Sequence, residues 1–137
     1  SSPLYAKLYQ AGLINKTFGL DFESNSETAH FVFGGESPNP AAVTEAILNE
    51  GVRIAWNGLD EAAFRRARRA EYGARVRALN SFDPLCIQIA KGHFAGYQYL
   101  DFAALYDQIT RHEVEELLRE SITGTRSALS IVNPKGV

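Results

Sequence analysis

Five consecutive residues, His112-Glu113-Val114-Glu115-Glu116, come close to the zinc-binding signature H-x-x-E-H. In that signature the second histidine adds a metal ligand one turn further along the same helix face. Glu116 stands where this second histidine would be. The other two histidines, His30 and His93, have no spacing that suggests a shared metal. We therefore expect no metal site and no catalytic residue in this chain.

A capping box explains the same segment without any chemistry. Thr110 stands three residues before Glu113, and side chains at this spacing satisfy free backbone N–H groups reciprocally at the start of a helix. The helix is expected to use Val114, Leu117 and Leu118 as its apolar side and to end by Gly124.

Cys86 is the only cysteine, and no histidine or second cysteine lies near it in sequence to form a nucleophilic pair. We expect it to be a buried structural thiol. A lone cysteine cannot form an internal disulfide, which favours a reducing compartment. The predicted location is cytoplasmic.

Six arginines gather on one predicted helix, which begins after Asp60 and ends near Leu79. A basic helix can bind phosphates. However, the net charge of the chain is -2, and Glu61 and Glu71 lie within pairing distance along the helix. We therefore expect no nucleic-acid partner and a solvated or interdomain role for the arginines. These residues are Arg65, Arg66, Arg68, Arg69, Arg75 and Arg77, and a stripe expected to face the core is formed by Ala63, Ala67, Ala70 and Ala74.

The overall composition is that of an ordinary globular protein. The chain has 137 residues, of which 45% are hydrophobic and 22% are charged, which fits one domain with a sizeable core. No apolar run approaches the roughly 20 residues of a membrane span, and no signal peptide is evident, so we expect no membrane partner. The chain begins Ser1-Ser2-Pro3 and contains no methionine, which suggests a part of a longer protein.

A predicted hairpin over residues 17–35 organises the rest of the chain. Apolar residues alternate on both sides of the turn residues Ser24-Asn25-Ser26-Glu27. The expected fold class is α+β, with an antiparallel sheet covered by helices on one face. The side chains expected to form the covered core face are Phe18, Phe22, Phe31 and Phe33.

Capping and breaking residues predict the other elements. Helices are expected from Pro3 to before Gly12, from Pro40 to Asn57, from an Asp83-Pro84 cap onwards, and around Phe102, Leu105 and Ile109. Gly51 falls inside the second of these, either as a tolerated weak point or as a close-packing site. A third strand is expected over Ala128–Val132.

The order of these elements resembles the insulinase-like zinc peptidases, the group that contains pitrilysin and the mitochondrial processing peptidases. The likeness is strongest to their bacterial processing-protease branch. Residues 1–14 (SSPLYAKLYQAGLI) are similar to the helix that leads into the substrate-side strand of the family, and residues 59–64 (LDEAAF) to the start of its long helix. Residues 105–110 (LYDQIT) through 130–136 (SIVNPKG) resemble its closing helix and strand.

This resemblance implies a metallopeptidase-like α/β sandwich repeat, with zinc in an N-terminal copy and a C-terminal copy that shapes the substrate chamber. Residues 1–137 would be a single domain, the latter part of the C-terminal domain of a longer zinc metalloendopeptidase. This chain would hold no cofactor and would be inactive alone. Members that complement catalysis carry an Arg and a Tyr after the leading helix, and the matching positions here are Tyr9 and Asn15. The pair is therefore absent.

The implied partners are the remainder of the parent chain, a peptide substrate, and a related subunit in a homo- or hetero-oligomer that supplies the missing pair. No substrate-binding residue is predicted. Two other classes remain open. One is a catalytically inactive scaffold subunit of such a peptidase, and the other is a free-standing α+β interaction domain whose arginine helix docks an acidic partner.

Overall fold

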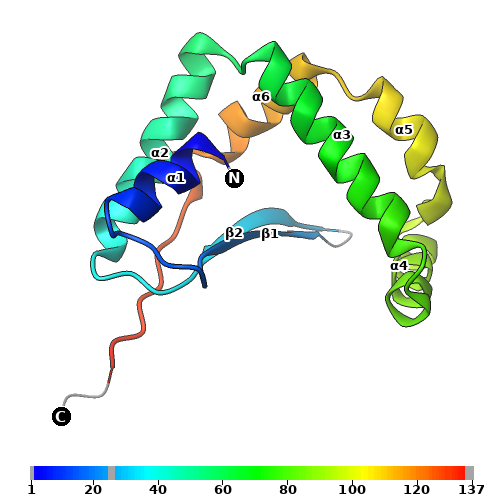
Figure 1. The fold of residues 1–137 in the computed structure, drawn as a ribbon, viewed down its shortest axis with the longest axis horizontal. Helices are drawn as coiled ribbons and strands as arrows, with labels where there is room; N and C mark the ends of the chain where they lie inside the picture. The colour runs from blue at the N-terminus through cyan, green and yellow to red at the C-terminus, as the bar shows by residue number, and fades with distance from the viewer. Residues whose placement is uncertain (1, 25–26, 135–137) are drawn as a thin grey trace. The chain divides into compact units, whose positions relative to one another are not determined.

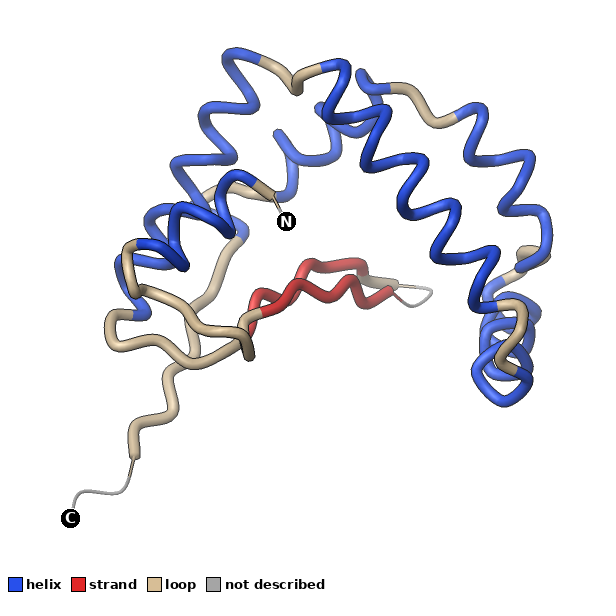
Figure 2. Tube along the Cα trace, in the orientation of Figure 1, coloured by secondary structure: helices blue, strands red, loops and turns tan. Residues whose placement is uncertain are grey.

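The structure is a computed structural model that describes residues 2–24 and 27–134. Within these ranges the chain forms six α-helices, two short 3-10 helices and one antiparallel hairpin (Figures 1 and 2). The chain divides into two compact units. The first unit extends to Gly58 and resumes at Glu116, and the second unit is Leu59–Glu115. No helix among the described residues is both long and apolar enough to cross a membrane.

Two helices of the first unit begin where the sequence predicts. Helix α1 (Pro3–Gln10) starts after Ser2, whose hydroxyl accepts a hydrogen bond of 3.2 Å from the backbone N–H of Tyr5. Helix α2 (Pro40–Asn57) starts after Asn39, whose side-chain oxygen accepts a 3.2 Å bond from the N–H of Ala42. These caps satisfy backbone donors that have no partner within the helix. Both predicted helices are confirmed.

The core of the first unit lies where α1 and α2 meet. Leu8 is only 2% exposed and packs with Ile14 and Val43, and Phe18 packs against this cluster. Figure 1 shows α1 beside α2, which matches these contacts. Burial of apolar side chains is the main force that holds the two helices together.

The predicted hairpin is present as β1 (Gly19–Ser24) and β2 (Ala29–Gly34). The register pairs Leu20 with Phe33 and Phe22 with Phe31, so these four side chains share one face. The ring centroids of Phe22 and Phe31 are 5.1 Å apart. Turn residues 25–26 lie outside the described residues.

The predicted helical cover on this face is wrong for the described part of the chain. Leu20 is 60% exposed and Phe22 is 51% exposed, while Phe31 and Phe33 are half-buried. Phe18 alone of the predicted core phenylalanines packs against the buried cluster of α1 and α2. A short hairpin buries apolar area only when another layer lies on it. The α+β class itself is confirmed.

The predicted third strand is also wrong. Residues 127–134 form no helix or strand, and Figure 2 draws them as a loop. A β-branched run forms a strand only where its backbone groups find an edge to pair with. Within the described residues the sheet contains only β1 and β2.

The second unit is built from helices. Helix α3 (Glu61–Ala78) begins after Asp60, whose carboxylate accepts a 2.7 Å bond from the N–H of Ala63, as predicted. The next helix begins earlier than predicted, with Ser81 at its N-cap and Asp83 within its first turn. The following elements are α4 (Phe82–Ala95), η1 (Tyr99–Asp101), α5 (Phe102–Gln108) and the start of α6 (Arg111–Ser121); η2 (Gly124–Arg126) lies in the first unit.

The packed face of α3 differs from the prediction. The four alanines expected to face the core are exposed, and the side chains that turn inward include Phe64, Arg68 and Arg75. Tyr72 contacts the rings of Phe102 and Tyr106 at centroid distances of 5.9 and 5.8 Å. Aromatic rings bury far more area than alanine methyl groups, and arginine stems can lie along them. The aromatic side therefore determines how α3 packs.

Candidate functional site

Tyr9 and Asn15, the two positions that the resemblance matched to a substrate-holding pair, lie at the end of α1 and in the segment before β1. Tyr9 is 44% exposed and stacks on Tyr5, with ring centroids 6.0 Å apart and planes 14° apart. The hydroxyl of Tyr5 donates a 3.4 Å hydrogen bond to the backbone carbonyl of Asn15. The end of α1 therefore presents a pair of stacked phenols.

Asn15 uses its side chain to organise the backbone. Its amide nitrogen donates to Glu36 at 2.8 Å, and its oxygen accepts from the N–H and the hydroxyl of Thr17 at 2.8 and 2.6 Å. The Thr17 hydroxyl also accepts a 3.2 Å bond from the N–H of Glu36. This network ties the chain before β1 to the chain after β2. Asn15 therefore has a structural role, because its side chain holds the two ends of the hairpin together.

The segment at the start of α6 that resembles the zinc-binding signature forms a capping box, as predicted. The N–H and hydroxyl of Thr110 donate to the carboxylate of Glu113 at 2.8 and 2.7 Å, and the N–H of Glu113 donates back to the hydroxyl at 3.2 Å. The backbone hydrogen bond from Thr110, followed by the bond from its hydroxyl, lowers the pKa of Glu113 below its ordinary value. Glu113 therefore acts in capping.

Glu115, which stands at the glutamate position of the zinc signature, also has a structural role. It is only 8% exposed and accepts a 2.7 Å bond from the N–H of Leu59. Arg111 lies 3.3 Å from Glu115 and 3.6 Å from Glu61, and it donates to the carbonyl of Leu59 at 3.2 Å. This cluster joins the first turn of α6 to the start of α3 inside the second unit. A general base needs an accessible carboxylate, which this buried and paired group does not provide.

Cys86 and the histidine and acidic side chains are the remaining candidates for thiol or metal chemistry. Among those residues no group of three or more His, Cys, Asp or Glu side chains could hold a metal ion. Cys86 is exposed on α4, so the prediction of a buried thiol is wrong. The apolar side of α4 is short, and even Ile89 is 42% exposed. Burial of Cys86 would need a neighbour that the second unit does not place there.

The six arginines of α3 fall into two sets, one hydrogen-bonded within the second unit and one exposed. Arg68 donates a 3.1 Å bond to the carbonyl of Ile109, and Arg75 donates a 2.9 Å bond to the hydroxyl of Tyr106, so both serve internal packing. The prediction that they point away with the others is wrong. Arg65 is exposed and lies 3.8 Å from Glu61. The remaining three, Arg66, Arg69 and Arg77, are exposed.

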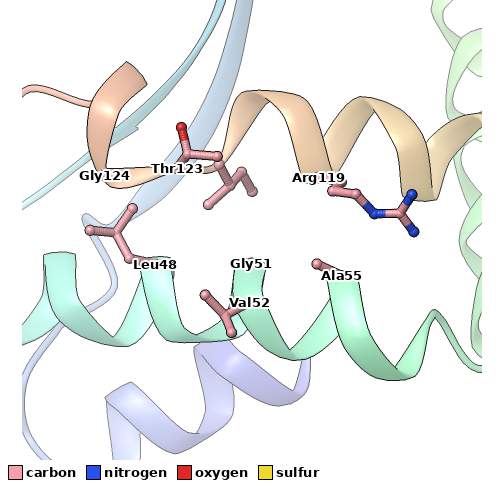
Figure 3. Close-up of a pocket in the computed structure, with 8 residues that line it drawn as sticks. Leu48, Gly51, Val52, Ala55, Arg119, Thr123 and Gly124 are labelled. Atoms are coloured by element: carbon pink, nitrogen blue, oxygen red, sulfur yellow. The ribbon is translucent and has the colours of Figure 1, made fainter.

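A small apolar hollow of about 180 Å³ lies in the first unit between α2 and the end of α6 (Figure 3). The two segments approach closely at Gly51, where a Cβ atom would lie 2.7 Å from Cγ2 and 2.9 Å from the carbonyl oxygen of Ile122. Gly51 is therefore a close-packing site, one of the two predicted explanations. Arg119 is the single charged residue in the lining. The hollow can hold an apolar group but contains no acid–base pair.

An aromatic cluster surrounds Arg75 in the second unit and was not predicted from the sequence. Tyr72, Phe102 and Tyr106 contact one another, and Tyr99 contacts Phe102 at 5.9 Å. The spacing of Phe102 and Tyr106 on one helix face was a usable signal. Tyr72 on α3 is distant in sequence from Phe102 and Tyr106, so no local pattern could join it to them.

The chain is similar in sequence to one known peptidase and in fold to another. No family model matches it. It is 29% identical over 135 residues to the uncharacterized zinc protease YmfH of Bacillus subtilis (strain 168), covering 98% of this chain and 31% of that protein. It also resembles the crystal structure of a protein from Alicyclobacillus acidocaldarius classed as an M16-like peptidase. That match has a TM-score of 0.76 and 23% identity, and it covers 88% of this chain and 29% of the other. Together they confirm the resemblance to the insulinase-like, or M16, peptidases.

Proposed function

From this resemblance over nearly its whole length, we propose that the chain is a non-catalytic part of the C-terminal domain of a longer zinc-dependent insulinase-like peptidase. Its role is to shape the peptide-binding chamber and to contact other subunits. The observation that carries the proposal is the match of 98% of this chain to only 31% of a zinc protease. The shared fold, with a TM-score of 0.76 over 88% of the chain, supports it.

The site geometry supports a non-catalytic role. Tyr9, at the position matched to the arginine, is stacked on Tyr5, and Asn15, at the position matched to the tyrosine, is held by Thr17 and Glu36. Neither residue is the one that complementing members are expected to carry there. Glu115 is buried in an ion-pair cluster. We therefore propose that the catalytic zinc of the parent lies in its N-terminal domain and that a related subunit supplies the Arg–Tyr pair. The proposed location of the parent is the cytoplasm.

The exposed apolar face of the hairpin fits a position beneath another layer of the parent protein. Leu20 and Phe22 are more than half exposed, and Phe31 lies across from Phe22. We propose that the remainder of the parent chain covers this face. Exposed aromatic pairs of this kind are unusual on the free surface of a soluble monomer.

Metal analysis tests the proposal directly. The 137-residue chain, purified without chelator, is expected to contain no stoichiometric zinc and to cleave no peptide, whereas the longer parent is expected to contain one zinc per polypeptide. The control is the parent with its zinc-binding histidines replaced. One zinc per 137-residue chain, or a parent without zinc, would contradict the proposal.

An inactive scaffold subunit is the second candidate, because the substrate-holding pair is absent at Tyr9 and Asn15. A parent that lacks zinc but still associates with a related peptidase subunit would favour it. The free-standing domain that docks an acidic partner is less favoured. Two of the six arginines that would form its surface, Arg68 and Arg75, turn toward the second unit and donate hydrogen bonds there, so they do not extend the exposed basic face.

A further inference from the structure

The second unit contains a hollow of about 240 Å³ between the C-terminal half of α3 and residues 97–109. Arg75 is the only charged residue in its lining. Aromatic side chains make up most of the rest, namely Tyr97, Tyr99, Phe102 and Tyr106. A single guanidinium beside an aromatic wall is suited to a ligand with one anionic and one apolar end.

Internal contacts use only part of the Arg75 guanidinium. Its Nε donates to the Tyr106 hydroxyl at 2.9 Å and lies 3.4 Å from a carboxylate oxygen of Glu71. Its two terminal nitrogens make no hydrogen bond to another described residue. Burial opposes the charge, but the hydrogen bond to Tyr106 and the nearby Tyr106, Glu71 and Tyr99 groups raise the pKa of Arg75 above its ordinary value. Glu71 is mostly exposed, so water screens its attraction strongly.

The wall of the hollow is held in place by packing. Tyr99 and Phe102 are buried, and their ring centroids are 5.9 Å apart. Gly92 of α4 lies directly under the loop, since a Cβ atom there would be 2.9 Å from the carbonyl oxygen of Tyr97. The site is therefore largely formed before any ligand arrives, which reduces the entropy cost of binding.

We propose that this hollow binds a carboxylate that carries an apolar or aromatic group. The terminal nitrogens of Arg75 receive the carboxylate, because the guanidinium fork matches its two oxygens. The aromatic wall receives the apolar group. In a peptidase domain the ligand with this chemistry is the C-terminal residue of a peptide. That identification rests on the proposed function, whereas carboxylate binding rests on the hollow alone.

The test is an NMR titration of the ¹⁵N-labelled 137-residue chain with N-acetyl-L-phenylalanine and, in parallel, with N-acetyl-L-phenylalanine amide. The acid is expected to shift amide signals of residues 97–109 with a dissociation constant on the order of 1 mM, as suits so small a probe. The amide, which lacks the carboxylate, is expected to bind at least about tenfold more weakly. Equal shifts with acid and amide, or shifts confined to other regions, would overturn the proposal.

Two variants on α3 give a matched comparison. Arg75→Gln is expected to weaken binding of the acid at least about tenfold, while Arg69→Gln, which removes an exposed charge from the same helix, is expected to change it less than about twofold. Equal losses in the two variants would show general charge attraction and would overturn the site. If Arg75→Gln unfolds the second unit, Arg75→Lys and the wild-type shift map decide instead. The lysine variant is expected to bind more weakly, because it keeps the charge but loses the fork.

A third probe, 3-phenylpropanoate, separates the two sources of such a ligand. Weaker binding than N-acetyl-L-phenylalanine would support a peptide end, and equal or tighter binding would assign the hollow to free carboxylic acids and overturn the peptide identification. Failure of all three probes would refute the hollow without affecting the zinc measurement. The two proposals therefore fail independently.

Discussion

Replacing Gly51 by alanine perturbs a close contact between α2 and Ile122, which follows α6. The added methyl group would lie 2.7 Å from Cγ2 and 2.9 Å from the carbonyl oxygen of Ile122. Such overpacking typically costs about 1–3 kcal/mol. Alanine gains about 0.5–1 kcal/mol over glycine inside a helix. Because one of the two clashing atoms belongs to the backbone and cannot rotate away, we expect a net loss of about 1–2 kcal/mol.

The matched control is Gly73→Ala in α3. A Cβ atom there would meet only the flexible end of Arg77 at 3.4 Å, so the same substitution is expected to stabilise its helix by about 0.5–1 kcal/mol. Urea unfolding followed by circular dichroism measures the free energies, and hydrogen exchange of α2 and α3 amides reports each helix by itself. Combining Gly51→Ala with Ile122→Ala should recover part of the loss. Stabilisation by Gly51→Ala equal to that of Gly73→Ala would refute the close contact.

Three further predictions concern the core, the hairpin and the capping box. Leu8→Ala should cost about 2–5 kcal/mol in urea unfolding, because Leu8 is fully packed, and a loss below about 1 kcal/mol would contradict the assigned core. Phe22→Ala should cost less than about 1 kcal/mol in the isolated 137-residue chain, because the ring is half exposed, and a core-sized loss would show a covered face. Glu113→Ala should destabilise at neutral pH but not in strong acid. The folded-state pKa of Glu113 is lowered, so its contribution is present above its unfolded pKa of about 4.3 and is lost as the pH falls through the folded value. A loss that does not change with pH would contradict the capping role.

Local signals predicted the helices of this fold well. The caps at Ser2, Asn39, Asp60 and Thr110 all act within a few residues, and each forms the expected hydrogen bond. Sequence pattern alone placed α2 at Pro40–Asn57 because the breaking residues on both sides are strong.

The failures share a long-range cause. The alanine stripe of α3 and the arginines opposite it have clear helical period, but which side packs depends on Tyr72 meeting Phe102 from another helix. The aromatic face of the hairpin has the pattern of a buried sheet, yet burial needs a second layer that the described residues do not supply. The predicted burial of Cys86 is wrong for the same reason, since the apolar character of a side chain does not reveal whether another element packs on it.

In the candidate site, too, local features could be predicted from the sequence and long-range contacts could not. The absence of an Arg–Tyr pair at Tyr9 and Asn15 could be seen in the sequence. The hydrogen bond from Asn15 to Glu36 joins residues that are 21 positions apart, so it could not be predicted from the sequence. The Arg75 hollow joins α3 to residues after α4 and was missed for that reason.

The most direct test of the central claim is the peptide-cleavage rate of the zinc-loaded parent, measured alone and after mixing with a related subunit that carries the Arg–Tyr pair. The proposed function predicts cleavage in the mixture at least about a hundredfold faster than with either protein alone, as expected when groups that position the substrate are restored. Tyr9→Phe in the parent should leave that rate unchanged, because the stacked ring rather than its hydroxyl holds the position. A parent that cleaves peptides at full rate alone, and loses this activity with Tyr9→Phe, would contradict the claim that this segment is non-catalytic.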